Sequence, residues 1–350
     1  MKLVSWGEMP SENLRFLRAC RGRSVDATPV WFMRQAGRYM AEYRELRKRH
    51  SILELAKTPA LACEVTMQPV NALPVDAAIL FADILLPVET MGLKLKFAPG
   101  PEISNPVRTA RDVARLTDRT AAADLGYVYD AVRLIRRELG GKVPLIGFAG
   151  APYTIASYMV EGGPSDHYKI VKAMMTDSPA LWDRLMRKVR VVTARYLKGQ
   201  VDAGAQAVQL FDSWIGALTP EQYRRHVQPH SAWVLKEAEK WGVPTISFGT
   251  GTNGFLEDFS AAGGDVIGVD WRIDLDVARK RLGKKPVQGN LDPILLFSSK
   301  KVIRAAVKDV VDRNGGRNGH IFNLGHGILP QTPVENVRYA ATCVHELTAR

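Results

Sequence analysis

The chain has 350 residues, of which 46% are hydrophobic and 24% are charged, so its composition is that of a globular protein with a sizeable core. No apolar run approaches the roughly 18 residues of a membrane span, and residues 1–10 lack a secretion signal, so we expect a cytoplasmic protein without a membrane partner. The net charge of +12 suits an anionic partner or simply a soluble basic surface, and charge alone does not separate these possibilities.

Short apolar runs bounded by Gly, Pro and Asp alternate with longer amphipathic stretches along the chain. Runs of this kind are typical of buried parallel strands. We predict eight strands, at residues 29–33, 76–81, 144–148, 207–211, 244–248, 266–269, 286–288 and 320–323.

Helix-start signals lie in the stretches between these strands. Ser178, Thr219 and Thr332 each precede a proline, which is the pattern of a capping residue followed by the first helical position. Gln222 and Glu335 complete capping boxes with Thr219 and Thr332. After Ser178, apolar residues recur at helical spacing, at Leu181, Leu185, Val189, Val192 and Tyr196.

Eight strands that alternate with helices predict a single (β/α)8 TIM-type barrel domain over residues 1–350. The alternative is a doubly wound open sheet. In a barrel the catalytic side chains follow the strands, at the C-terminal rim. The polar residues in such positions are Arg34 and Arg38 after the first strand, Asp83 after the second, Tyr158 after the third, Ser213 after the fourth and His326 after the eighth.

Each of these residues also has a purely structural interpretation. The arginines could be surface residues, although the apolar Trp31-Phe32-Met33 leads directly into them. Asp83 could cap the next helix. For Tyr158, Ser213 and His326, position alone favours a structural role.

Several longer blocks connect these residues. The chain contains Trp31-Phe32-Met33-Arg34-Gln35-Ala36-Gly37-Arg38-Tyr39, Phe81-Ala82-Asp83-Ile84-Leu85, Gly150-Ala151-Pro152-Tyr153-Thr154, Tyr158-Met159-Val160-Glu161-Gly162-Gly163, Gln209-Leu210-Phe211-Asp212-Ser213 and Asn323-Leu324-Gly325-His326-Gly327. Through these blocks, in this order, the chain resembles the uroporphyrinogen decarboxylase family. It departs from the family at Ala41, where relatives often carry proline, and at Ser213, where many carry threonine.

The resemblance implies a homodimer that acts on uroporphyrinogen, a tetrapyrrole with eight carboxylates, and converts its four acetate arms to methyl groups. Asp83 would face the pyrrole N–H groups, and Arg34 and Arg38 would hold carboxylates and take part in catalysis. The resemblance implies the following substrate-binding residues: Arg34, Gln35, Ala36, Gly37, Arg38, Arg47, Asp83, Tyr158, Ser213 and His326.

No metal or organic cofactor is expected. Cys20, Cys63 and Cys343 lie far apart and form no CxxC pair. His226 and His230 are four residues apart, but Pro229 breaks the helix that would align them. No lysine ends an apolar strand run in the manner of a Schiff-base lysine.

Three other functions compete with this interpretation. Residues 249–254, Gly-Thr-Gly-Thr-Asn-Gly, match the dinucleotide-binding GxGxxG pattern, with Asp270 at the end of the next strand. Related zinc-dependent methyltransferases share the fold, but their His-x-Cys pair is absent here. A nucleic-acid-binding protein would account for the basic run at residues 44–49, although Glu42 and Glu45 make that run a solvated helix face. We therefore expect no nucleic-acid partner.

Overall fold

The structure, a computed structural model, describes residues 15–97, 100–119 and 122–350; residues 1–10, where we expect no secretion signal, lie outside these ranges. In this part of the chain a curled parallel sheet has the strand order β1-β4-β5-β6-β7-β8-β9. Its strands are β1 (Ala78–Ile79), β4 (Leu145–Gly150), β5 (Ala207–Asp212), β6 (Thr245–Gly249), β7 (Val266–Gly268), β8 (Val287–Gln288) and β9 (His320–Ile321).

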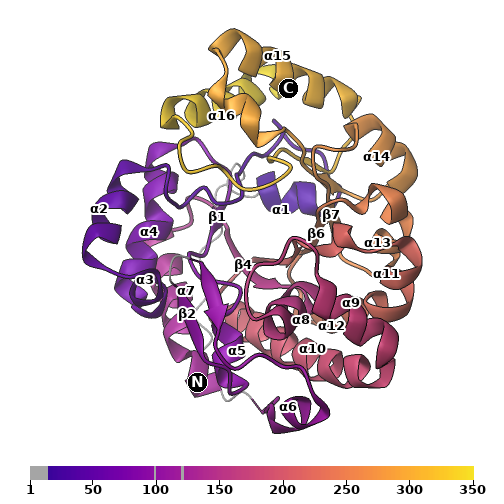
Figure 1. The fold of residues 1–350 in the computed structure, drawn as a ribbon. Coiled ribbons are helices and arrows are strands. Elements are labelled where there is room, and N and C mark those ends of the chain that lie inside the picture. Colours follow the sequence, from indigo (N-terminus) through magenta and orange to yellow (C-terminus); the bar gives the residue numbers. More distant parts are fainter. Residues whose placement is uncertain (1–14, 98–99, 120–121) are drawn as a thin grey trace.

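The sheet grows by adding each new strand beside the previous one, and helices surround it (Figure 1). A doubly wound sheet would reverse its strand order at a switch point, and this sheet does not. Every residue of β4 and of β6 is buried, because side chains inside the curl and helices outside it cover both faces. The α/β class is thus confirmed, with a ladder of seven parallel strands.

The first predicted strand, residues 29–33, is reduced to a single bridge. Val30 pairs with Phe322 beside β9, and its carbonyl accepts a hydrogen bond from Asp76 N (2.8 Å) just before β1. Side chains take the neighbouring N–H groups: Asp76 accepts from Val30 N and Asn323 accepts from Met33 N. Because these donors are already bonded, the segment does not extend as a regular strand.

The helices are α1 (Arg15–Cys20), α2 (Ala41–Arg49), α3 (Ile52–Lys57), α4 (Pro59–Ala72), α5 (Leu86–Thr90), α6 (Ala110–Arg115), α7 (Gly126–Leu139), α8 (Pro152–Glu161), α9 (Lys169–Asp177), α10 (Pro179–Asp202), α11 (Pro220–His226), α12 (Gln228–Ala238), α13 (Leu256–Ala261), α14 (Leu275–Leu282), α15 (Lys300–Arg313) and α16 (Val334–Thr348). The 3-10 turns are η2 (Ala122–Leu125), η3 (Ile215–Ala217), η4 (Glu239–Trp241), η5 (Thr252–Phe255) and η6 (Pro293–Phe297). Among these described elements, no helix combines the length and the apolar character that crossing a membrane requires.

The predicted helix starts have mixed outcomes. Helix α10 follows Ser178, whose side chain forms no cap bond, and it buries the predicted stripe from Leu185 to Tyr196. The capping box of Thr219 with Gln222 is present at α11. The capping box of Thr332 with Glu335 is wrong: α16 begins after Pro333, so Thr332 lies too far from the first turn for its hydroxyl to cap it.

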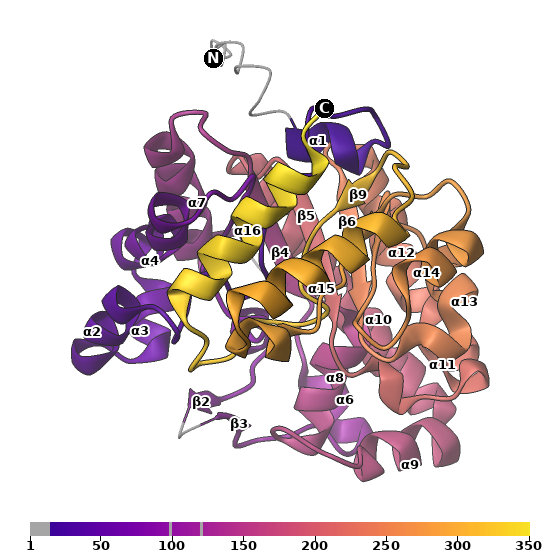
Figure 2. The same ribbon diagram turned by 90° about the horizontal axis from the view of Figure 1, so that it is seen from above.

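An antiparallel hairpin that the sequence did not predict joins β2 (Leu95–Phe97) to β3 (Pro101–Ile103). Ile103 N donates a hydrogen bond to Gly162 O (2.8 Å), at the end of α8. Helix α8 follows β4, so the hairpin, bonded to the end of α8, stands at the carboxyl end of the sheet, where Figure 2 shows it at the edge of the molecule. It forms part of the wall around that end.

Candidate functional site

The turn at residues 34–38 is held on its buried side by the side chain of Gln35. The Gln35 side chain is fully buried; its Oε1 accepts from Phe32 N and its Nε2 donates to Ala77 O, both at 3.0 Å. The carbonyl of Gln35 also accepts from the Tyr39 hydroxyl (2.8 Å). Gln35 therefore supports the turn from inside the protein. The N–H groups of Ala36 and Gly37 form no hydrogen bond to the described residues, so they are available to a ligand.

This turn holds Arg34 in an uncommon backbone conformation, with φ at 61°. Arg34 is exposed to solvent; the protein packed around its side chain lowers the pKa of its guanidinium, and the like charge of Arg38 lowers it further. Gly327 makes room for the Arg34 side chain, because a Cβ at position 327 would lie 2.4 Å from Arg34 Cδ. The Asn323–Gly327 block thus supports the arginine turn directly.

Asp83 follows β1 and lies three residues before helix α5, whose N-cap position is Leu85. Its Oδ1 accepts from Leu85 N (2.8 Å) and closes the turn before α5, but the prediction that Asp83 caps this helix is wrong, because the N-cap residue is Leu85 and no described side chain caps the helix. The carboxylate also faces the site: burial raises its pKa, while the bond from Leu85 and the positive charge of Arg34 oppose this rise. Asp83 is therefore a half-buried acid that accepts a bond from the Leu85 backbone and on which the positive charge of Arg34 acts.

Tyr158, on α8, lies close enough to Asp83 and Arg34 for their charges to act on it. Burial raises the pKa of its phenol to about 12, with a further increase from Asp83 and a decrease from Arg34. The hydroxyl is consequently a neutral donor near pH 7. Among the described residues, no group forms a hydrogen bond with it.

His326 and Ser213 belong to the same rim. Burial lowers the pKa of His326 to about 4, and the charges of Arg34 and Arg272 lower it further, so the imidazole is neutral at physiological pH. Ser213 follows β5 and is half-buried, and its carbonyl accepts from Thr250 Oγ1 (2.6 Å). Both residues offer uncharged polar groups to a ligand.

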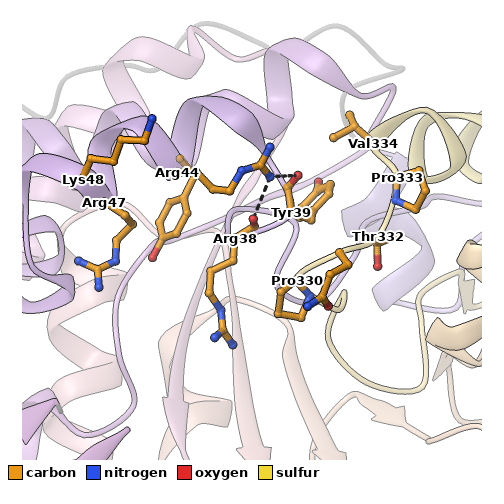
Figure 3. A pocket seen from close by; sticks show the side chains of 11 residues that line it. Arg38, Tyr39, Arg44, Arg47, Lys48, Pro330, Thr332, Pro333 and Val334 are labelled. Carbon is orange, nitrogen blue, oxygen red and sulfur yellow. Dashed lines mark hydrogen bonds between the residues drawn. The ribbon is translucent and has the colours of Figure 1, made fainter. Parts of the chain in front are cut away.

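Arg38 and Arg47 line a cavity of about 910 Å³ between α2 and residues 330–334, which we call the basic groove (Figure 3). Arg44 and Lys48 share its wall. Arg44 donates to the carbonyls of Arg38 (3.1 Å) and Tyr39 (2.8 Å), which ties α2 to the arginine turn. Figure 3 shows the Arg38 side chain extending away from Arg44. The groove is lined by neither Arg34 nor Asp83, so the predicted residues form two groups that meet at the 34–38 turn.

The GxGxxG look-alike at residues 249–254 is engaged with its own acidic partner. Asp270 accepts from Gly251 N (2.7 Å) and from Arg272 N (3.0 Å), and it forms an ion pair with the Arg272 side chain. A dinucleotide site would need this carboxylate free for the ribose hydroxyls. The loop has a structural role instead.

The described residues contain no group of three or more His, Cys, Asp or Glu side chains that could hold a metal ion. Helix α11 ends at His226 and α12 begins at Gln228, so the two histidines four residues apart do not share one helix, as predicted. All three cysteines are free and buried.

Sequence reasoning missed Trp214, directly after Ser213. Its ring stacks on Tyr158 with centroids 3.9 Å apart, and it meets Tyr168 edge-on at 5.2 Å. A large aromatic residue two positions after the end of β5 was the available signal, because residues that follow a barrel strand lie at the rim.

The chain is similar to known proteins over almost its whole length. The family profile described as "Uroporphyrinogen decarboxylase (URO-D)" matches residues 11–347. Uroporphyrinogen decarboxylase of Carboxydothermus hydrogenoformans is 55% identical over 340 residues, covering 96% of this chain and 97% of the relative. That of Sorangium cellulosum is 57% identical over 336 residues, covering 95% and 96%.

Among solved structures, a methyltransferase from Methanosarcina mazei superposes with a TM-score of 0.78 at 21% identity, covering 96% of this chain and 98% of its own. A B12-independent methionine synthase from Shewanella sp. W3-18-1 superposes with a TM-score of 0.57 at 10% identity, covering 84% and 88%. These two likenesses concern the fold.

Proposed function

The chain belongs to the uroporphyrinogen decarboxylase family of carboxy-lyases, and we propose that it converts uroporphyrinogen III to coproporphyrinogen III without a cofactor. The proposed site is supported by the proximity of Arg34, Asp83 and Tyr158 near the carboxyl ends of the strands, where they act electrostatically on one another. Each acetate arm loses carbon dioxide and becomes a methyl group.

The pyrrole ring of the substrate supplies the electron sink. A proton adds to a ring carbon and makes the ring cationic. The bond to the carboxylate then breaks, carbon dioxide leaves, and its electron pair forms an exocyclic double bond while the ring becomes neutral. A second proton adds to the exocyclic carbon to complete the methyl group, and the ring carbon loses its extra proton. The net change per arm is one carboxyl replaced by hydrogen.

Asp83 offsets the positive charge that develops on the ring. A cation and a carboxylate about 4 Å apart attract by about 4 kcal/mol at an effective dielectric near 20. Because the bond from Leu85 already orients the carboxylate, little reorganisation is needed during the reaction. This placement favours the transition state over the bound substrate.

The arginines of the two groups of residues bind different carboxylates of the substrate. Arg34 holds a carboxylate beside the reacting ring, and Arg38 and Arg47 hold outer carboxylates in the basic groove. A guanidinium suits this task because its planar fork pairs with both carboxylate oxygens. Neutral donors at Tyr158, Ser213 and His326, with the free N–H groups of Ala36 and Gly37, orient the remaining arms.

The finer architecture belongs to the same proposal. Residues 29–31 take the place of the eighth strand, between β9 and β1, and close the sheet into a (β/α)8 barrel. This barrel is the single domain of the chain. The Val30 bridge to Phe322 and the bond from Asp76 N support this closure. On the family resemblance we also propose a cytoplasmic homodimer, which sedimentation would detect as twice the chain mass of 38.7 kDa.

The direct test incubates the purified protein with uroporphyrinogen III under reducing, anaerobic conditions and separates the products by chromatography. We expect intermediates with seven, six and five carboxylates, followed by coproporphyrinogen. Unchanged substrate in the presence of folded protein would contradict the proposal.

A further inference from the structure

Tyr158 presents a hydroxyl that no described residue holds by a hydrogen bond. Its position therefore depends on how its ring is packed. The stacked partner is Trp214, at 3.9 Å between centroids and 30° between ring planes. Tyr168 covers Trp214 edge-on, so Trp214 lies between two tyrosines. Tyr168 shares with Arg34 the left-handed backbone that is rare outside glycine, with φ at 50°.

The backbone under Trp214 is held from one side by a buried pair. Trp214 N donates to Thr154 Oγ1 (3.4 Å), and Thr154 Oγ1 donates to Asp212 Oδ1 (2.7 Å). Asp212 and Thr154 are both buried. Burial raises the pKa of Asp212 to about 7 in spite of the bonds from Thr154. Burying a carboxyl group costs free energy of folding. Here the buried Asp212 holds Thr154, which binds the backbone at the start of the turn that carries Trp214.

From the other side the turn is held by the glycine loop at residues 249–254. Thr250 Oγ1 donates to Ser213 O, and a Cβ on Gly216 would lie 2.7 Å from Thr250 O. The loop is itself anchored by the bond from Gly251 N to Asp270. The motif that resembles a dinucleotide site thus packs against the turn that carries Trp214.

We propose that Trp214 is a positioning residue that holds the Tyr158 phenol against Asp83 and Arg34, and that the glycine loop, through Thr250, keeps Trp214 in place. The inference rests on the proposed function, in which Tyr158 orients a substrate arm. It assigns the glycine loop a role in substrate orientation instead of nucleotide binding.

The test compares paired variants with uroporphyrinogen as the probe. Trp214→Leu removes the stacked ring, and Trp214→Phe keeps an aromatic face. We expect kcat/KM to fall about tenfold for the leucine variant, mainly through KM, and to recover most of the way with phenylalanine. Thr250→Val removes the hydroxyl and should lower kcat/KM by a smaller factor, whereas Thr250→Ser keeps the hydroxyl and should retain most of kcat/KM. Trp233→Leu is the matched control for the loss of a tryptophan ring. Trp233 lies on α12, is also half-buried, and packs against the guanidinium of Arg190 instead of Tyr158.

A double-mutant cycle separates positioning from general damage. In a Tyr158→Phe background the phenol is gone, so Trp214→Leu should then change kcat/KM by less than about threefold. Circular dichroism and melting temperature verify that each variant is folded. Additive losses in the cycle, or equal losses for the leucine and phenylalanine variants, would overturn the positioning role. If Tyr158→Phe alone keeps normal KM and kcat, the site role of Tyr158 is wrong, and the positioning proposal is overturned with it.

Discussion

The two groups of polar residues at the carboxyl end of the sheet differ in how they are held. Around Arg34, Asp83 and Tyr158, burial shifts the pKa of each group, and backbone bonds fix the turns that carry them. In the basic groove, Arg38, Arg47 and Lys48 are exposed, as Arg34 is, and they lie on or next to helix α2, away from Asp83 and Tyr158.

This difference indicates that the two groups contribute to different steps, one to the chemical reaction and the other to substrate binding. Charges in an enclosed, preorganised space act strongly on a charge that forms during the reaction. Exposed cations act mainly on encounter and on ground-state binding, and salt screens them. We therefore expect changes at Asp83 and the residues that act on it to slow the chemistry, and changes in the groove to weaken substrate capture.

The largest effect is expected for Asp83→Asn. Asparagine keeps the shape and can accept from Leu85 N, so the fold should persist and the melting temperature should stay near that of the unchanged protein. The amide cannot offset the ring cation, so kcat should fall by up to about three powers of ten, with a smaller change in KM. Steady-state kinetics and a melting curve on the same preparation measure both. A folded variant with undiminished kcat would remove Asp83 from the chemistry.

Arg34→Ala should come next, with kcat/KM reduced by about two powers of ten. The change removes a carboxylate anchor and takes from the half-buried Asp83 the positive charge that favours its ionised form, so KM should rise and kcat should fall. Arg34→Lys is the control, because lysine keeps the charge but lacks the planar fork. Its kcat/KM should lie between that of the unchanged enzyme and that of Arg34→Ala. Normal kinetics for the alanine variant would exclude Arg34 from the site.

In the basic groove, Arg38→Ala and Arg47→Ala should each raise KM by about tenfold and leave kcat nearly unchanged. KM should also rise with ionic strength in the unchanged enzyme, and less steeply in these variants. Arg133→Ala, at an exposed residue paired with Asp130 on α7, is the matched surface control. A KM independent of salt would show that the groove does not attract the substrate.

The pH profile compares the two groups in one experiment. Burial raises the pKa of Asp83, and catalysis needs its ionised form, so kcat/KM should fall as the pH drops through a pKa above the ordinary value of about 3.9. Arg34→Lys keeps the opposing charge and should leave this acidic limb in place, whereas Arg34→Ala should move it to higher pH. Arg47→Ala should not move it. An acidic limb at the same pH in all variants would contradict the coupling of Arg34 to Asp83.

Metal removal should have no effect. Dialysis against a chelator, followed by assay in metal-free buffer, should leave kcat and KM unchanged, because the proposed mechanism uses the substrate's own ring as electron sink. Loss of activity that zinc restores would contradict this mechanism.

The sequence predicted the buried strands and the polar residues that follow them, because short apolar runs and rim positions are local features. It did not predict the β2–β3 hairpin, which is stabilised by contact with the end of α8. It predicted a first strand at residues 29–33 that is reduced to Val30, because the competing acceptors, Asp76 and Asn323, come from distant parts of the chain.

The site shows the same limit. Gln35 belongs to the arginine block, but only the fold reveals that its amide is used inside the protein. The Gly249–Gly254 pattern predicts a phosphate loop until Asp270 is seen bonded to Gly251. Trp214 gains its role from contact with Tyr158, 56 positions earlier in the chain. Partners that distant leave no local pattern.

Single-turnover kinetics test this separation of chemical reaction and substrate binding most directly. Enzyme in excess over uroporphyrinogen, rapidly mixed without oxygen and quenched over time, reports the first loss of carbon dioxide at saturating enzyme. We expect Asp83→Asn to slow this step by about two to three powers of ten and Arg47→Ala to leave it within about twofold of the unchanged enzyme. An equal slowing by both variants, or none by Asp83→Asn, would contradict the assignment of the chemistry to Asp83 and of substrate capture to the basic groove.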